Sequence, residues 1–202
     1  MEILEQRIQK DGRLIGQDII KVDSFLNHQI DPQLMTALAA EIYRRFADSG
    51  ITKVLTIEAS GIAFAFPIAL AFGVPLVFAK KSKTRNVSDD AYVADVDSFT
   101  HNCTNTIRVS KEYLNENDRV LIADDFLALG NAVCGLEKLV TAAGGKVVGV
   151  AIAVEKGFQG GGDALRAAGM RVESLAIIDS VDQSGKIKFR SDDFLRDKKE
   201  SM

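Results

Sequence analysis

Two adjacent acidic residues, Asp124 and Asp125, have the clearest chemical potential in the sequence. They follow four apolar residues, 120–123, that are typical of a buried strand, and a small-residue turn, Ala128–Ala132, leads from them into an apolar helical pattern. Ligands of parallel sheets bind beyond the carboxyl ends of the strands, and a helix N-terminus can bind an anion. A carboxylate pair can hold hydroxyl groups or a hydrated metal ion. The pattern therefore indicates a sugar-phosphate site, and the alternative is a solvated turn that caps the next helix.

A second small-residue turn, Glu58–Gly61, follows an earlier apolar strand. Small residues let a phosphate approach backbone N–H groups closely. Taken alone, this segment could be an ordinary tight turn. Taken with the turn at 128–132, it suits a ligand that carries phosphate at both ends. The turn at 128–132 is not a P-loop, because no lysine of the Walker motif follows Gly130.

A long polar segment, Lys80–Asp97, interrupts the alternation of strands and helices. It carries four cations, at Lys80, Lys81, Lys83 and Arg85. Long loops in compact domains are often lids or disordered segments. Its position after a core strand favours a lid that closes over phosphates and excludes water. A solvated run of charges is the alternative interpretation.

Two further side chains near expected strand ends could contact the rest of a ligand. Lys156 ends the strand that follows the acid pair, and its ammonium either reaches solvent or contacts a ligand oxygen. Phe126 either belongs to the core or lies against a flat ring.

The two histidines, His28 and His101, form no metal pair, and no Ser-His-Asp set is recognisable. Hydrolysis through a serine nucleophile is therefore not favoured.

Composition places the 202-residue chain among ordinary globular proteins. Its hydrophobic content is 47% and its net charge is −3, so nothing favours bulk electrostatic capture of nucleic acid. Cys103 and Cys134 lie far apart and indicate neither a zinc site nor a disulfide framework. The charged N-terminus has no apolar signal core, and no segment is long and apolar enough to span a membrane. We therefore expect a cytoplasmic protein without membrane or nucleic-acid partners.

The elements that must position these residues alternate between strands and helices. Continuously apolar strands predict an α/β fold with a central parallel sheet flanked by helices. The expected strands are 53–57, 76–79, 98–100, 106–110, 120–123, 146–154 and 172–178, with a strand or extended arm at 19–26, and the expected helices are 2–10, 32–48, 62–72, 132–143 and 163–168. We expect one domain over 1–202, in which about 30 N-terminal residues form a cap and the tail 191–202 is disordered.

The run 120–132, VLIADDFLALGNA, resembles the 5-phosphoribosyl-1-pyrophosphate (PRPP) motif of type I phosphoribosyltransferases. Nearly the whole chain more closely resembles the bacterial xanthine phosphoribosyltransferases. This resemblance is carried by KVDSFLNHQIDP (21–32), TIEASGIA (56–63), EKGFQ (155–159) and RVESLA (171–176). The PRPP motif indicates the donor, whereas the N-terminal segment and EK-x-F narrow the acceptor to xanthine.

The resemblance implies a type I phosphoribosyltransferase fold with a small N-terminal hood, formed by residues 1–35, over the base and a flexible loop. It implies purine salvage, in which xanthine and PRPP give xanthosine 5′-monophosphate and pyrophosphate. It also implies a homodimer, and Mg²⁺ that is bound mainly through PRPP rather than by protein ligands.

Roles for individual residues follow from the same resemblance. Asp124 and Asp125 hold the ribose hydroxyls and form the catalytic group together with Lys81 of the lid. The residues assigned to xanthine are Ile20, Asn27, Phe126 and Lys156. The residues assigned to PRPP are Ala128, Leu129, Gly130, Asn131 and Ala132 in one turn, and Glu58, Ala59, Ser60 and Gly61 in the other.

The chain departs from the family pattern at two places. Many members read ANGQA where this chain reads ALGNA at 128–132, which preserves the backbone amides, and position 20 is often Leu instead of Ile.

The alternatives to xanthine salvage are adenine salvage, hypoxanthine-guanine salvage and a non-catalytic PRPP-sensing regulator. Lys156 argues against adenine, whose 6-amino group cannot accept a hydrogen bond from an ammonium. The short N-terminal extension argues against a DNA-binding module of ordinary domain size.

Overall fold

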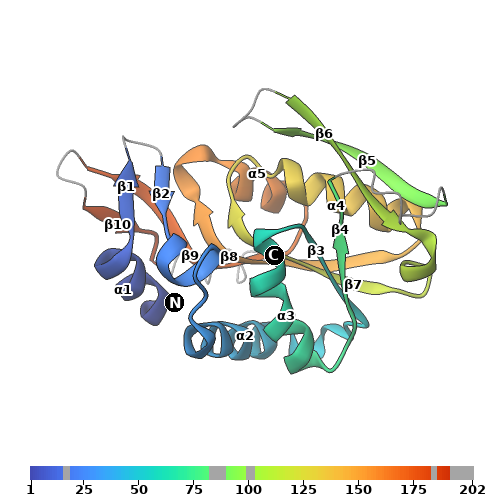
Figure 1. The fold of residues 1–202 in the computed structure, drawn as a ribbon, viewed down its shortest axis with the longest axis horizontal. Coiled ribbons are helices and arrows are strands. Elements are labelled where there is room, and N and C mark those ends of the chain that lie inside the picture. Colours follow the sequence, from blue (N-terminus) through green and yellow to red (C-terminus); the bar gives the residue numbers. More distant parts are fainter. Residues whose placement is uncertain (16–18, 82–89, 99–102, 183–185, 192–202) are drawn as a thin grey trace.

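A six-stranded sheet forms the centre of the computed structural model, which describes residues 1–15, 19–81, 90–98, 103–182 and 186–191 (Figure 1). The strand order is β10-β9-β8-β7-β3-β4, and all neighbouring strands are parallel except β10, which runs antiparallel to β9. The strands are β3 (Lys53–Ile57), β4 (Leu76–Ala79), β7 (Arg119–Leu127), β8 (Lys146–Lys156), β9 (Val172–Val181) and β10 (Ile187–Phe189). The α/β fold class with a central parallel sheet is confirmed.

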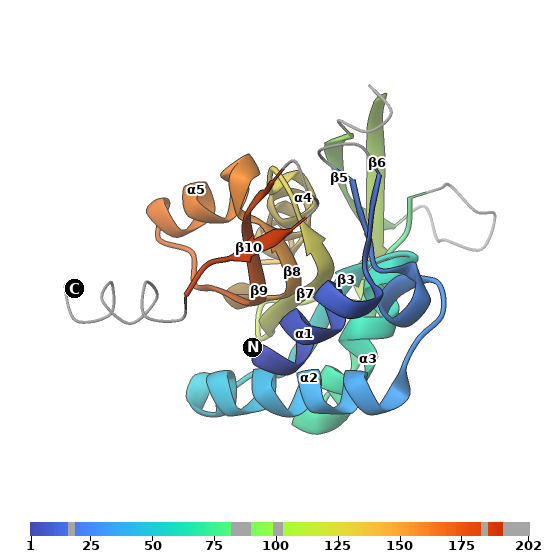
Figure 2. The same ribbon diagram turned by 90° about the vertical axis from the view of Figure 1, so that its left-hand side faces the viewer.

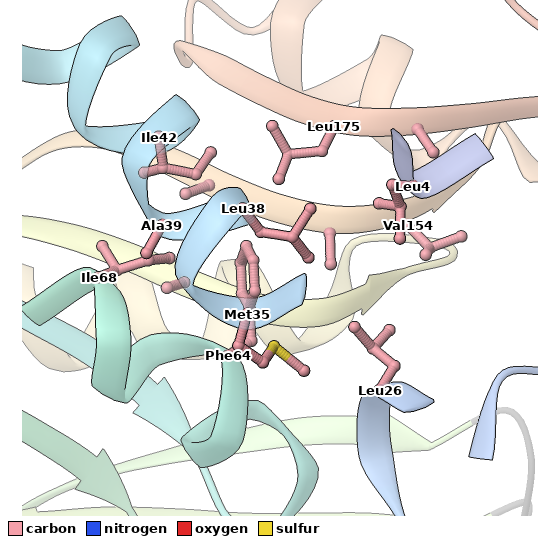
Figure 3. Packing of buried hydrophobic residues seen from close by; sticks show 14 of the residues in the cluster. Leu4, Leu26, Met35, Leu38, Ala39, Ile42, Phe64, Ile68, Val154 and Leu175 are labelled. Carbon is pink, nitrogen blue, oxygen red and sulfur yellow. The ribbon is translucent and has the colours of Figure 1, made fainter. Parts of the chain in front are cut away.

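Helices cover both faces of this sheet (Figure 2). On one face lie α2 (Pro32–Phe46) and α3 (Ser60–Phe72), and on the other lie α4 (Asn131–Ala142) and α5 (Gly161–Ala167). Side chains of β7 alternate between the two faces, so Leu121 packs with the first pair of helices and Ile122 with the second. Figure 3 shows the first cluster, in which Leu38 and Phe64 pack together with residues of the hood and the sheet.

The N-terminal hood consists of α1 (Glu2–Asp11), β1 (Arg13–Ile15), β2 (Ile19–Lys21) and the π-helix η1 (Asp23–Asn27). The predicted strand or extended arm at 19–26 is correct for β2 and wrong for the residues that follow. Phe25 and Leu26 are fully buried with Leu4 and Ile8 of α1. Because Val22, Phe25 and Leu26 have helical spacing, coiling buries all three, whereas a strand would expose part of the set.

A β-hairpin takes the place of the last part of the predicted long loop. Its strands are β5 (Ala91–Ser98) and β6 (Cys103–Ser110), paired antiparallel along their whole length. The loop prediction is therefore wrong for 91–97, where Ala94 and Val96 are buried at a spacing of two residues. The predicted lid cations Lys83 and Arg85 lie outside the described residues, as does the tail 192–202.

The strands that carry the acid pair and Lys156 extend further than predicted. β7 continues to Leu127 and β8 to Lys156, and Leu127 pairs with Glu155. Asp124 and Asp125 thus belong to the strand instead of following it. The remaining short elements are the turns η2 (Ala47–Ser49), η3 (Lys111–Tyr113) and η4 (Gly157–Gln159). Among the described residues, no helix has both the length and the apolar character to cross a membrane.

A buried ion pair supports the end of β8. Glu155 is completely buried, and its carboxylate accepts hydrogen bonds from Arg166 of α5 at 2.9 and 2.6 Å and from the hydroxyl of Ser174 at 2.5 Å. A Cβ atom on Gly162 would lie 2.1 Å from the carboxylate, so the start of α5 requires glycine there. This network fixes the backbone next to Lys156.

We expect Arg166→Met to lower the free energy of unfolding by about 3–5 kcal/mol, because it leaves the buried Glu155 carboxylate without its cation. Urea denaturation measures this change. The control is Arg44→Met, which breaks an ion pair of α2 whose arginine side chain is 72% exposed and should have little effect. Equal effects of the two substitutions would contradict the structural role given to the Glu155 network.

Candidate functional site

The predicted site residues meet at the carboxyl ends of β3, β7 and β8, with the N-termini of α3 and α4 directed to the same edge. Asp125 is only 5% exposed. Its Oδ1 accepts a hydrogen bond from the Ser60 hydroxyl at 3.0 Å, and its Oδ2 accepts one from Asn27 Nδ2 at 2.9 Å. Three residues assigned to different parts of the ligand are therefore in direct contact.

Asp124 lies beside Asp125 and is 6% exposed. Its Oδ1 accepts a hydrogen bond from the backbone N–H of Asp125 at 3.0 Å. Burial raises the pKa of Asp124 well above its ordinary value of 3.8, and the charge of Asp125 raises it further, while the positive charge of Lys81 acts in the opposite direction. The pair thus takes up a proton more readily than two exposed carboxylates would.

The turn after β3 is tied to the start of the predicted lid. Glu58 and Ala59 form the turn, joined by a cis peptide bond, and Ser60 begins α3. Glu58 Oε1 accepts a hydrogen bond from the backbone N–H of Lys81 at 2.6 Å. The Lys81 side chain is exposed. Two segments assigned to the same donor molecule are therefore adjacent in space.

Gly61 allows α3 to approach the acid pair. A Cβ atom at this position would lie 2.2 Å from Thr56 Oγ1 and 2.6 Å from Asp124 Oδ1. The Thr56 hydroxyl is itself buried and makes no hydrogen bond to the described residues. The absence of a side chain at position 61 is therefore a packing requirement of the site.

The second turn leads from β7 into α4. Ala128, Leu129 and Gly130 form a bend, Gly130 has φ +90°, and Asn131 begins the helix. Gly161 supports this bend, because a Cβ there would lie 2.2 Å from the carbonyl oxygen of Ala128. The sequence prediction missed this support, although the run of three glycines at 160–162 was a visible signal.

The residues assigned to the base lie on the side of the sheet that carries the hood. Lys156 Nζ is 5.9 Å from the centre of the Phe126 ring, so the two side chains form a cation–π contact. Ile20 is 5% exposed and belongs to the core cluster against which Phe126 packs. Asn27 extends from η1 to Asp125. No ligand contact of these residues is tested, so their roles stay predictions.

The phosphoribosyl transferase domain family matches residues 21–172. The chain belongs to this family. Two relatives named xanthine phosphoribosyltransferase come from Ruminiclostridium cellulolyticum, 56% identical over 94% of this chain and 99% of the relative, and from Clostridium novyi, 51% identical over 95% of this chain and 100% of the relative. The expected resemblance is confirmed.

Solved phosphoribosyltransferase structures share the fold at low sequence identity. The adenine phosphoribosyltransferase of Trypanosoma brucei has a TM-score of 0.74 and 17% identity, and covers 96% of this chain and 91% of its own. That of Giardia lamblia has a TM-score of 0.73 and 24% identity, and covers 86% of this chain and 96% of its own. At these identities the likeness concerns the type I fold alone.

We expect Gly61→Ala in this phosphoribosyltransferase to lower kcat/KM for PRPP by about 100-fold or more, because the new methyl group displaces Asp124 or Thr56 and a small misplacement has large catalytic effects. Steady-state kinetics measures the loss. The control is Gly73→Ala at the other end of α3, where φ is +66° and a Cβ contacts nothing. It should cost about 1–2 kcal/mol of stability and leave kinetics unchanged. Wild-type kinetics in Gly61→Ala would refute the packing requirement.

The raised pKa of Asp124 predicts a pH-dependent stability. Above 3.8, the unfolded Asp124 loses its proton while the native one retains it, so the free energy of unfolding falls as pH rises through the native pKa. Asp124→Asn carries no charge to bury and should lack this fall, which makes it relatively more stable at neutral pH. Thermal unfolding of both proteins across acid to neutral pH measures the difference, and parallel curves would contradict the assignment.

Proposed function

We propose that this protein transfers the 5-phosphoribosyl group from PRPP to xanthine, giving xanthosine 5′-monophosphate and pyrophosphate. The observation that carries the proposal is the contact between the hood and the donor site, where Asn27 donates to Asp125. It joins the segment that resembles xanthine-specific relatives to the acid pair of the PRPP motif. The relatives named xanthine phosphoribosyltransferase, at 56% and 51% identity over nearly the whole chain, support the same acceptor.

In the proposed donor complex, each part of PRPP meets a different element. The 5′-phosphate lies against the backbone N–H groups of 128–132 at the N-terminus of α4. Asp124 and Asp125 accept hydrogen bonds from the ribose hydroxyls. The pyrophosphate lies at Glu58–Gly61 and the N-terminus of α3, beside Lys81. The carboxylate oxygens of this edge also suit Mg²⁺, which would enter with PRPP and neutralise the pyrophosphate charge.

Catalysis in this proposal is mainly positioning and charge stabilisation. As pyrophosphate leaves, the anomeric carbon of PRPP gains oxocarbenium character, and a ring nitrogen of xanthine forms the new bond to it. The Asp124–Asp125 pair holds the ribose, while the base lies against Phe126. Lys156 donates to a ring carbonyl, and its charge favours the enolate-like anion of xanthine. The hood excludes water from the reacting atoms.

The domain organisation and the oligomeric state of the protein are also proposals. We propose one domain, supported by the core cluster that joins hood residues such as Leu4 and Phe25 to the sheet. We propose a homodimer, supported by large apolar side chains that α3 exposes, with Phe66 at 60% and Leu70 at 73%. We also propose a cytoplasmic location.

We expect Lys156→Ala to raise KM for xanthine roughly tenfold or more, because a hydrogen bond from a charged donor is lost, while KM for PRPP changes little. Initial rates of xanthosine 5′-monophosphate formation measure both constants. Lys146→Ala, at the other end of β8 with an exposed side chain, is the control and should behave as wild type. Equal increases in both KM values would eliminate the base-binding role of Lys156.

A further inference from the structure

The carboxylate of Asp125 fixes the orientation of the Asn27 amide. A carboxylate only accepts hydrogen bonds, so the amide must turn its nitrogen, and not its oxygen, toward Asp125 Oδ2. The Ser60 hydroxyl holds the other oxygen, Oδ1, from the opposite side at 3.0 Å. Asn27 therefore faces an acceptor that does not move.

The backbone of Asn27 is held independently of this hydrogen bond. Phe25 and Leu26, the two preceding residues, are completely buried. The guanidinium of Arg7 lies 5.2 Å from the centre of the Phe25 ring and pairs with Asp31 at 2.9 Å. The N–H of Asp31 in turn donates to the carbonyl of Phe25 at 3.0 Å. Because η1 is anchored in this way, rotation of the side-chain amide is the main motion that Asn27 retains. The hydrogen bond to Asp125 prevents this rotation.

An oriented amide presents a defined pattern to a ligand. One N–H of Asn27 donates to Asp125. Within the described residues no other hydrogen bond uses the second N–H or the carbonyl oxygen, which leaves a donor next to an acceptor. Xanthine offers the complement, a 2-carbonyl acceptor beside ring N–H donors. Hypoxanthine carries only a C–H at position 2, which leaves the amide donor unpaired. A site built for a hydrogen bond discriminates strongly against an analogue that lacks the partner.

We propose that Asp125 is a positioning residue for acceptor selection, in addition to its role toward the ribose: it sets the amide orientation with which Asn27 distinguishes xanthine from hypoxanthine. This inference rests on the proposed function, because it assumes that Asn27 faces the base. It makes one carboxylate common to the donor and acceptor sites. Binding of the ribose hydroxyls to Asp125 and reading of the base by Asn27 are consequently linked.

The test compares two acceptors in four proteins: wild type, Asn27→Leu, Asp125→Ala and the double variant. The measured quantity is kcat/KM for xanthine divided by kcat/KM for hypoxanthine. A general loss of PRPP binding cancels in this ratio. We expect each single variant to lower the ratio roughly tenfold or more, because the amide donor is lost or misdirected, and the double variant to lower it no further. Lys146→Ala is the control, since its exposed side chain lies at the other end of β8 and its loss should leave the ratio unchanged.

Three results would overturn the proposal. The first is an unchanged ratio in Asp125→Ala beside a lowered one in Asn27→Leu, the second is an additive loss in the double variant, and the third is an unchanged ratio in Asn27→Leu. If Asp125→Ala turns over too slowly, the ratio of Kd values for xanthosine and inosine 5′-monophosphates, measured by calorimetry, gives the same comparison. Failure of the proposed function itself would look different, because the wild type would then form no product from xanthine.

Discussion

Two carboxylates lie side by side at the end of a buried strand, and the neighbouring elements are shaped around them. A buried charge is costly unless it is paired or hydrogen-bonded. Asp125 is stabilised by Ser60 and Asn27, which come from α3 and the hood. Asp124 accepts a hydrogen bond from the backbone N–H of Asp125, and burial raises its pKa. The acid pair thus connects three segments that are distant in the sequence, and each of them is assigned to a different part of the ligand.

The segments beside the acid pair can approach one another closely because they carry glycine at positions where no side chain would fit. Gly61 brings α3 against Asp124, Gly161 brings α5 against the turn at 128–130, and Gly162 brings it against Glu155. The approach at Gly61 places the N-terminus of α3 near the carboxyl edge of the sheet, and Gly161 supports the turn that leads to the N-terminus of α4. Backbone N–H groups at these two helix starts can hold an anionic donor. Burial of the Asp124 carboxylate lowers the stability of the fold. The core clusters on the two faces of the sheet provide the stabilisation that offsets this loss.

Much of the fold could be predicted because apolar residues recur at regular, recognisable spacings along the long strands and helices. The π-helix at 23–27 was missed, since Val22, Phe25 and Leu26 fit a strand in a short window and only packing on α1 decides between the two. Strand β5 was missed because acidic residues mask the alternation of Ala94 and Val96. In the site, residue types predicted the acid pair and both turns. The hydrogen bond from Asn27 to Asp125 could not be predicted, because it depends on how the hood folds over the sheet.

The proposed function is a single reaction at this edge of the sheet. Its direct measurement is nucleotide formation from PRPP and Mg²⁺ with xanthine, guanine, hypoxanthine and adenine supplied separately. We expect xanthosine 5′-monophosphate from xanthine and no product from adenine, because Lys156 needs a carbonyl acceptor on the base. Product from adenine without product from xanthine would contradict the acceptor assignment and leave only the fold in place.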